Sequence, residues 1–394
     1  MKPPKPDERV EILRDRQRVK MARSAQSYVR GSTARFYAWL EEGDRRLPEG
    51  PQVWIGGDCH YGNLGPIAGA KGDIAIQIRD LDQTVIGNPT HDVIRLALSL
   101  ASAARGSNLP GGTTARMVEQ IVDGYQSALV AKTRRQDDRP PLVRGLMRAS
   151  KRRTWDNLAR ERIEDLRPTI PLGKRFWTLS DEERGGVEAL VASEAVRELA
   201  TLLHSRPSGA PVSLVDAAYW VKGCSSLGLL RYALLVAVGS GKHRELCLID
   251  VKEAVRAAAP RAGGAAMPKD NGQRVVEGAR HLAPNLGERM RASRLLDRSV
   301  FIRELRPQDL KLEIEHLEPE EAILVARFLA GVIGRAHGRQ MDAADRAHWA
   351  QELDRNRSKS LDAPSWLWTS VVDLMASHEA AYLDHCRRHA RVAA

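Results

Sequence analysis

The side chains with the clearest potential for chemistry lie in the first quarter of the sequence. Asp58 and Asn63 belong to the segment GGDCHYGN, and Asp80 and Asp82 belong to the segment IQIRDLDQ. Phosphoryl transfer needs a group that orients the acceptor hydroxyl and metal ions that neutralise charge on the transferred phosphate. Because carboxylate and amide oxygens suit magnesium, Asp58 is the predicted catalytic base and Asn63 and Asp80 are the predicted metal ligands. Asp82 lies on the same face of its strand as Asp80 and is a further candidate ligand.

Two short strands are predicted to position these side chains. PQVWIGGD has the pattern of a buried strand that runs into a glycine turn, and the apolar residues of DIAIQIRDLD alternate as in a second strand. A loose amphipathic stripe predicts helix over the first 45 residues. GNPTHDVIRLALSLASAARG predicts a turn and then a helix capped by Asn88 or Thr90, which stops at Gly106.

The rest of the chain divides into a helical stretch, a small sheet and further helices. Residues 113–205 read as mostly helical, and the proline and glycine cluster at 206–211 marks a domain boundary. The segment from AAYWVKG to LIDVKEA then predicts three antiparallel strands, with a Gly/Ser turn and a GSGK hairpin between them. A helix near 273–282, a strand at SVFIREL, and helices at 318–338 and 364–391 complete the prediction.

Composition limits the class of protein. The chain has 394 residues with 43% hydrophobic content, so it can bury a large core. We expect no membrane span and no secretory signal, and therefore a cytoplasmic protein. The four cysteines are scattered and predict neither a zinc ribbon nor a disulfide framework. The net charge of +11 suggests an anionic partner, but the aromatic content is 5% and no nucleic-acid motif is visible. The basic segment 132–175 is either a solvated helical face or a site for an anionic substrate.

The motif that contains Asp58 resembles the catalytic loop of the aminoglycoside and choline phosphotransferases, a branch of the protein-kinase-like enzymes. GGDCHYGN is similar to their HGDLHPGN, although Gly56 stands where those enzymes have histidine. IQIRDLD is similar to their strand that ends in the metal-binding aspartate. GNPTHDVIRLA looks like their GDPAYDLA segment, and this resemblance implies that Asp92 braces the catalytic loop from the start of a helix.

The nucleotide-binding half of such an enzyme is expected later in the chain. VKGCSSLGLLRYALLV resembles a kinase glycine-rich loop between two strands. The loop residues that the resemblance assigns to the nucleotide are Gly223, Ser225, Ser226 and Gly228, with Ser225 at the position of the middle glycine. Because this segment follows the catalytic loop and does not precede it, the resemblance implies a circular permutation.

Three further positions complete the resemblance to a nucleotide lobe. Lys252 in LIDVKEA stands where kinases place the phosphate-binding lysine on the third strand. Glu277 in RVVEGARHL is the candidate ion-pair partner of Lys252 on the following helix. SVFIREL looks like the strand that leads to the hinge, which would place the nucleotide near Glu304 and Leu305.

Over roughly residues 20 to 390 the chain also resembles the uncharacterised bacterial family called domain of unknown function 2252. The shared segments include GDCHYGNLG, IRDLDQTVIGNPTHDVIRLALSL, RVVEGAR and GRAHGR. This family usually has Asn-Phe-Gly and Asn-Asp-Phe-Asp where the present chain has Asn63-Leu64-Gly65 and Arg79-Asp80-Leu81-Asp82. Both departures leave the proposed metal-binding side chains in place.

Together these observations predict a two-lobed, protein-kinase-like α+β fold with circular permutation. The expected parts are residues 1–206 with the catalytic loop, 207–305 as the nucleotide sheet, and 306–394 as helices that return to the large lobe. The expected activity is transfer of phosphate from ATP with magnesium to a hydroxyl group, on a small molecule or alternatively on a protein. Residues 113–205 are expected to line the acceptor side. A kinase-like nucleotide-binding regulator, an AMP-transferring enzyme and, more distantly, a metallophosphoesterase are the alternatives.

Overall fold

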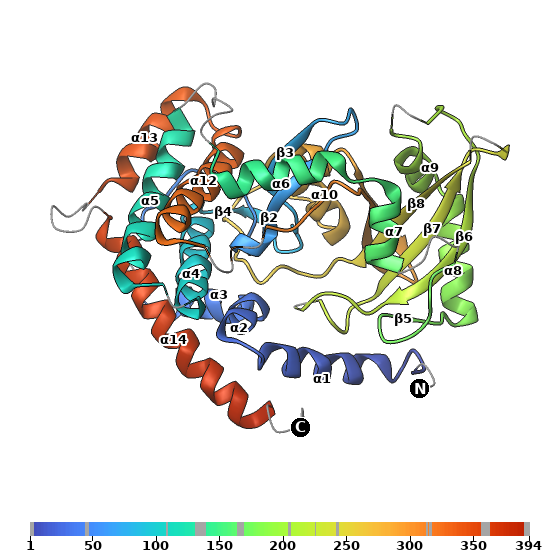
Figure 1. The fold of residues 1–394 in the computed structure, drawn as a ribbon, viewed down its shortest axis with the longest axis horizontal. Helices are drawn as coiled ribbons and strands as arrows, with labels where there is room; N and C mark the ends of the chain where they lie inside the picture. The colour runs from blue at the N-terminus through green and yellow to red at the C-terminus, as the bar shows by residue number, and fades with distance from the viewer. Residues whose placement is uncertain are drawn as a thin grey trace.

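A computed structural model gives the fold. It describes residues 4–389 except for 44–46, 108, 131–138, 164–168, 204–205, 225, 242–243, 313, 315–316 and 356–362. The molecule combines a helical lobe with an antiparallel sheet that carries its own helices (Figure 1). This arrangement confirms the expected α+β class. In the part of the chain that the structure describes, no helix has the length and apolar content needed to span a bilayer.

The described part of the first 90 residues contains three helices and two small two-stranded antiparallel sheets. The helices are α1 (Arg9–Met21), α2 (Ala25–Gly31) and α3 (Thr33–Glu41). The short strands are β1 (Val53–Ile55), β2 (Leu64–Ala68), β3 (Ile74–Ile78) and β4 (Val85–Gly87), with a 3-10 turn η1 (Tyr61–Asn63) before β2. Strand β1 pairs with β4, and β2 pairs with β3. The segments that carry Asp58 and Asp80 therefore follow β1 and β3, as the apolar pattern predicts.

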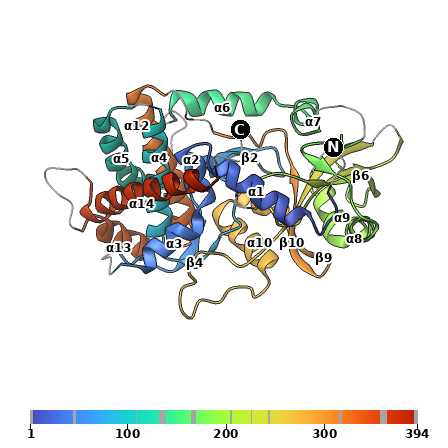
Figure 2. The same cartoon turned by 90° about the horizontal axis from the view of Figure 1, so that it is seen from below.

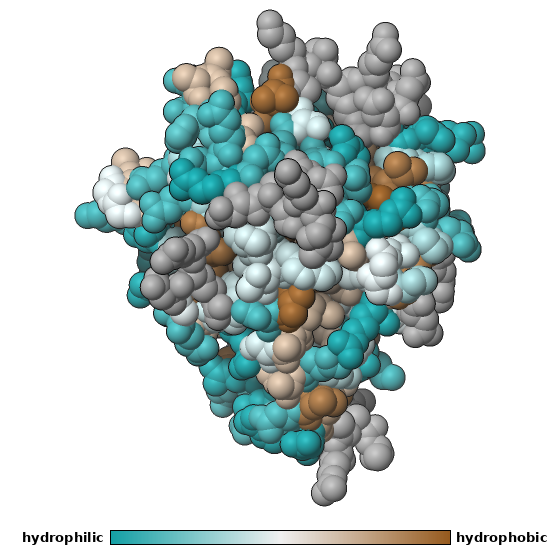
Figure 3. All heavy atoms as spheres, turned by 90° about the vertical axis from the view of Figure 1, so that its left-hand side faces the viewer, coloured by the Kyte–Doolittle hydropathy of each residue, from teal (hydrophilic) through white to brown (hydrophobic). Residues whose placement is uncertain are grey.

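The helical lobe is built around three long, largely buried helices. The three are α4 (Thr90–Gly106), α5 (Gly111–Val130) and α12 (Pro319–Gly338). The lobe also contains α6 (Pro141–Arg152), α13 (Ala343–Leu353) and α14 (Ser365–His389). Glycines let α5 and α12 approach closely: a Cβ atom on Gly124 would lie 2.1 Å from the carbonyl oxygen of Arg327. On the side formed by α5, α13 and α14, the described surface is mainly hydrophilic, with its apolar residues in small separate groups (Figure 3).

The second lobe is a six-stranded antiparallel sheet with the order β5-β6-β7-β8-β10-β9. Its strands are β5 (Phe176–Trp177), β6 (Val212–Trp220), β7 (Arg231–Val238), β8 (Glu245–Glu253), β9 (Met290–Leu295) and β10 (Arg298–Leu305). Leu234 of β7 and Ile249 of β8 pack on one face with α8 (Asp181–Ala192) and α9 (Glu194–Ala200). The other face turns towards the helical lobe and carries α7 (Trp155–Ile163) near its edge. Helices α10 (Asn271–Leu282) and α11 (Pro284–Gly287) separate β8 from β9.

The sheet lobe takes in residues from both sides of the predicted boundary at 206. Strand β5 pairs with β6, and apolar residues of α8 and α9 join the core beneath the sheet. The periodicity of α8 and α9 predicts helices but does not predict the sheet against which they pack. The sequence pattern alone therefore groups them with the helical segment. Strand β9 was also missed, since MRASRL has few apolar residues.

Helix α1 extends from one lobe to the other (Figures 1 and 2). Near its N-terminal end, the buried guanidinium of Arg9 pairs with Glu183 of α8 at 2.6 Å. Past its C-terminal end, the carbonyl oxygen of Ala22 accepts a hydrogen bond from Tyr382 of α14 at 3.2 Å. Between these contacts the ammonium group of Lys20 donates to the carbonyl oxygen of Gly223 at 2.7 Å. The helix therefore contacts the sheet lobe, the glycine-rich loop and the helical lobe.

Candidate active site

The loop after β1 is fixed by a glycine turn and by Asp92. Gly57 has φ +72°, and a Cβ atom there would lie 2.1 Å from the carbonyl oxygen of Gln83, so only glycine fits. The buried carboxylate of Asp92, in the first turn of α4, accepts hydrogen bonds from the backbone N–H groups of Gly56 at 2.6 Å and Gly57 at 2.9 Å. The expected bracing of the loop by Asp92 is thus confirmed.

A buried chain of hydrogen bonds supports Asp92 from behind. His337 Nε2 lies 3.2 Å from Asp92 Oδ2, and His337 Nδ1 lies 2.8 Å from the hydroxyl of Tyr125. The indole N–H of Trp349 donates to the same hydroxyl at 3.2 Å. The hydroxyl proton of Tyr125 is thus available for His337 Nδ1, which leaves the Nε2 proton to donate to Asp92. Helices α5, α12 and α13 together hold the carboxylate against the loop.

Replacing Asp92 by alanine is expected to destabilise the protein by about 3 kcal/mol, because two buried backbone donors and His337 lose their acceptor. Thermal unfolding of the purified variant measures this effect. Asp92→Asn keeps one acceptor oxygen and should lose less stability than Asp92→Ala. An unchanged melting temperature for Asp92→Ala would show that the loop does not depend on this contact.

Asp58 lies in the braced loop with its carboxylate held by an arginine that sequence reasoning missed. Arg95 Nε donates to Asp58 Oδ1 at 2.8 Å, and Arg95 also donates to the carbonyl oxygen of Val29 at 2.6 Å. Arg95 follows Asp92 by three positions on α4 and so lies on the same helix face, which is the one sequence signal that could have found it. Asp58 is 8% exposed and faces a cavity.

His60 and Asn63 complete the loop around Asp58. His60 Nε2 lies 4.0 Å from Asp58 Oδ2. Burial lowers the pKa of His60 to about 4, so its ring is neutral at pH 7. The side-chain amide of Asn63 donates to the backbone carbonyl oxygen of Asp58 at 3.0 Å, which uses its nitrogen and leaves its oxygen for another partner. His60 thus packs within the loop, and Asn63 retains an oxygen suited to a cation.

The structure brings Lys252 of β8 to the two aspartates that follow β3. The ammonium group of Lys252 lies 3.6 Å from Asp80 Oδ1 and is hydrogen-bonded to Asp82 Oδ2. Burial opposes ionisation of Asp80, but the charges of Lys252 and Arg303 outweigh it and lower the pKa of that carboxyl group. Burial and the neighbouring Asp80 raise the pKa of Asp82 to about 6. Asp80 is therefore the better anionic ligand of the two.

These oxygens fit a magnesium ion that keeps water and phosphate ligands. Asp80 supplies an ionised carboxylate with a side chain that is 45% exposed, and Asn63 supplies an amide oxygen. Magnesium is often held by one or two protein ligands together with substrate phosphates. Within the described residues, no three His, Cys, Asp or Glu side chains cluster as a metal site of protein ligands alone. Asn63 and Asp80, which both line the cavity, are thus the candidate oxygen donors for a metal ion.

The glycine-rich loop between β6 and β7 lies on the opposite side of the same cavity. Gly223 and Gly228 have φ +106° and +98°, values that favour glycine. Ser226 is buried, and its hydroxyl occupies the space where a Cβ atom on Gly223 would lie, 2.4 Å away. Ser225 lies outside the described residues, so the structure does not place it. The turn is therefore tight and presents backbone to the cavity.

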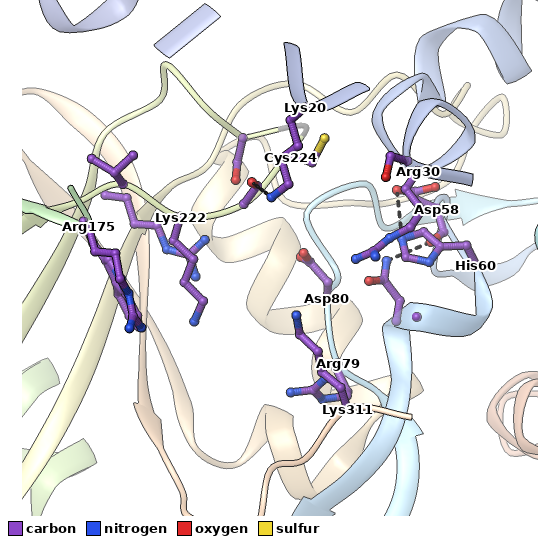
Figure 4. A pocket seen from close by; sticks show the side chains of 18 of the residues that line it. Lys20, Arg30, Asp58, His60, Arg79, Asp80, Arg175, Lys222, Cys224 and Lys311 are labelled. Atoms are coloured by element: carbon purple, nitrogen blue, oxygen red, sulfur yellow. Dashed lines mark hydrogen bonds and ion pairs between the residues drawn. The ribbon is translucent and has the colours of Figure 1, made fainter. Parts of the chain in front are cut away.

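The cavity has a volume of about 450 Å³ and a strongly cationic lining (Figure 4). Asp58 and Asp80 are its two described carboxylates. The described basic side chains that line it are Lys20, Arg30, Arg79, Arg175, Lys222, Arg231, Arg303 and Lys311. Of these, Arg231 and Arg303 are paired with the buried Asp250 at 2.6 and 3.1 Å. The excess of positive charge favours an anionic ligand such as a phosphate compound.

The described site residues predicted from the sequence that do not line this cavity are Asp82, Gly228, Lys252, Glu277, Glu304 and Leu305, although Lys252 contacts Asp80, which does. Glu277 pairs with Arg280 at 3.1 Å and not with Lys252. The carboxylate of Glu304 is held by two hydrogen bonds from Arg206, at 2.9 and 3.1 Å, and Leu305 packs with Leu158 of α7. Glu304 and Leu305 line a separate cavity of about 500 Å³. The apolar pattern of SVFIREL predicts a strand that ends near Leu305, but it does not predict that α7 packs over the end of that strand.

The expectation that residues 113–205 line the acceptor side stays a prediction. From this range, Arg175 lines the main cavity. Lys20 of α1 and Arg30 of α2 line it near Asp58, and sequence reasoning assigned neither of them to a site. An arginine on an amphipathic helix carries no local signal of the loop that it will meet after folding.

The fold and cavity define a mixed α and β protein with a cationic, carboxylate-containing cleft between its lobes. The chain belongs to the family described as uncharacterized proteins conserved in bacteria (DUF2252), whose model matches residues 9–388. Searches of curated proteins and of solved structures find no match to the chain.

Proposed function

We propose that the protein is an ATP- and magnesium-dependent phosphotransferase with a circularly permuted, kinase-like arrangement of its site. The observation that carries this proposal is the contact of Lys252 with Asp80 and Asp82, because Asp80 lines the same cavity as Asp58. Lys252 and Asp82 are 170 residues apart in sequence. A basic strand residue, a metal-binding carboxylate and a candidate base at or beside one cavity are the parts that phosphoryl transfer requires.

The order of elements supports the kinase-like interpretation of the sheet. In protein kinases a glycine-rich loop covers the nucleotide phosphates and the phosphate-binding lysine lies on the third strand. Here β6, β7 and β8 are successive neighbours, the glycine turn joins the first two, and Lys252 lies on the third. The catalytic loop precedes this unit in the chain, which is the permuted order. We take Asp80 and Asp82, and not Glu277, as the carboxylates that hold Lys252 before ATP binds.

In the proposed mechanism each side chain has one role. Backbone groups of the loop from Gly223 to Gly228 and the ammonium group of Lys252 bind the phosphates of ATP. Asn63 and Asp80 would hold magnesium, which neutralises charge on the phosphates. Asp58, oriented by Arg95, accepts the proton of the acceptor hydroxyl as that oxygen bonds to the γ-phosphorus. ADP leaves with the bridging oxygen.

The polar character of the cavity supports a role in binding phosphates. Its described lining includes eight basic side chains and two carboxylates. The absence of a three-ligand metal cluster among the described residues gives no support to a metallophosphoesterase, which binds two metals through protein side chains. The cytoplasmic location and the small-molecule acceptor remain parts of the proposal.

Labelled nucleotide tests the proposal and separates it from its alternatives. The purified protein is incubated with magnesium and ATP that carries label on the γ- or the α-phosphate, with a metabolite extract as the source of acceptors. Transfer of γ-label supports a phosphotransferase, whereas transfer of α-label supports AMP transfer. Nucleotide binding without transfer of either label would indicate a regulator and refute the proposed activity.

A further inference from the structure

Two basic side chains on one side of the cavity are not accounted for by the proposed handling of ATP. Lys20 at the end of α1 and Arg30 at the end of α2 both line the cavity. Arg30 lies on the same side of the cavity as Asp58, and Arg175 and Lys222 lie across from them (Figure 4). Arg30 is close to the loop that carries Asp58, since a Cβ atom built on Gly62 would lie 3.4 Å from Cζ of Arg30. This end of the cavity is therefore next to the candidate base.

Several basic groups near the cleft have a carboxylate partner, whereas Lys20 and Arg30 have none within the described residues. Arg231 and Arg303 share Asp250, Arg95 pairs with Asp58, and Lys252 pairs with Asp80 and Asp82. Lys20 donates to the carbonyl oxygen of Gly223, and the buried Nε of Arg30 has no hydrogen-bond partner.

The pair is held in an environment that disfavours uncompensated positive charge. Burial lowers the pKa of Lys20, and the nearby charge of Arg30 lowers it further. Two cations in such a place are stabilised when an anion binds between them. Because Arg30 Nε is buried without a partner, an acceptor oxygen there would also satisfy an N–H group that now lacks one.

The anionic groups of the two reactants are assigned to different parts of the cavity. Asp80, which Lys252 contacts, marks the part of the cavity where the phosphates of ATP are proposed to bind. Arg30 lies at the end where the proton of the acceptor is removed, beside Asp58. A guanidinium group forms paired hydrogen bonds with phosphate or carboxylate, so it suits an oxyanion carried by the acceptor.

We propose that the acceptor is itself an anion: a small hydroxyl compound with a phosphate or carboxylate group, which Arg30 and Lys20 bind while the hydroxyl points to Asp58. This inference rests on the proposed function, which supplies the transferred phosphate. The acceptor oxygen forms a bond to the γ-phosphorus and the bond from that phosphorus to the bridging oxygen breaks. The hydroxyl proton passes to Asp58, and the products are ADP and a doubly charged or more highly charged phosphoester.

A matched set of three-carbon probes tests the anion site by calorimetry. Glycerol, glycerate and glycerol 3-phosphate are titrated into the wild-type protein with magnesium and a non-hydrolysable ATP analogue present. We expect binding of at least one anionic probe and none of glycerol. Binding of glycerol 3-phosphate alone identifies a phosphate site, and binding of glycerate alone identifies a carboxylate site. Binding of glycerol as tight as that of both anions would overturn the proposal.

Variants of Arg30 provide the second part of the test. Arg30→Gln should weaken binding of the anionic probe at least tenfold, Arg30→Lys should restore part of it, and the affinity for the ATP analogue should not change. Arg116→Gln removes an exposed charge of α5 that does not line the cavity and serves as the control. Equal loss of analogue binding in Arg30→Gln, or unchanged probe binding, would overturn the proposal. A melting temperature for each variant verifies folding.

The two proposals fail in different ways. If the analogue does not bind to the wild-type protein, the proposed phosphotransferase activity is refuted. The probes are then titrated without nucleotide, and Arg30-dependent binding of an anion still supports the site. If the analogue binds and no anionic probe does, the anionic acceptor is refuted while the phosphotransferase proposal stands.

Discussion

The Asp80→Ala variant is expected to lose magnesium-dependent phosphoryl transfer by about a thousandfold while it remains folded. Asp80 is the cavity carboxylate proposed as the principal protein ligand of magnesium, and the alanine variant removes that oxygen donor. Loss of about 4 kcal/mol of charge stabilisation in the transition state corresponds to this factor. Lys252 keeps Asp82 as a partner, so the lobes should still meet correctly. Initial rates of ADP release over a range of magnesium concentrations measure the effect.

An exposed carboxylate provides the matched control for this change. Asp181 lies in the first turn of α8, away from the cavity, and Asp181→Asn should turn over at the wild-type rate. Asp80→Asn separates charge from shape, because the amide retains an oxygen but not the negative charge. Full activity of Asp80→Ala would refute its assignment as a metal ligand, provided that the wild-type reaction requires magnesium.

Asp58→Asn should lower kcat by about a hundredfold to ten-thousandfold with little change in the affinity for ATP. That range is typical of the loss of a general base. The amide still accepts a hydrogen bond from Arg95, which is fully buried, so the variant is preferable to alanine. We expect a lower melting temperature as well, because Arg95 loses the negative charge that compensates it.

The measurement that separates chemistry from binding is a single-turnover experiment with saturating ATP. Asp15→Asn, which changes an exposed carboxylate of α1, is the control and should behave as wild type. A variant Asp58→Asn that keeps the wild-type rate would exclude Asp58 as the base. One that fails to bind ATP would instead show that the loop contributes to the nucleotide site.

Local patterns predicted those parts of the site that depend on one segment. The helix from Thr90 to Gly106 was predicted to the residue at its C-terminal end, since a buried apolar run and its terminal signals are encoded within it. The position of Asp92 under the catalytic loop followed from the resemblance of two adjacent motifs. The strand that carries Lys252 was visible from its apolar alternation.

Contacts between distant segments could not be predicted in this way. Glu277 was chosen by its place on the helix after Lys252, but the face of α10 that meets the catalytic segment carries Arg274, which donates to the carbonyl oxygens of Asp82 and Thr84. Lys20 and Arg30 reach the cavity because α1 spans the two lobes (Figure 1) and α2 packs against α4, which is a fact of tertiary packing. Helical periodicity says which residues share a face, but not what that face will meet.

Helix α1 also has a mechanical consequence. A cleft between two lobes exchanges its ligands by opening, and the work of opening depends on what spans the gap. Here the pair of Arg9 and Glu183 anchors the helix to one lobe, and the bond from Tyr382 to Ala22 anchors it to the other. Widening the cleft must detach one anchor or bend the helix. We therefore expect these two anchors to resist opening of the cleft in the proposed enzyme.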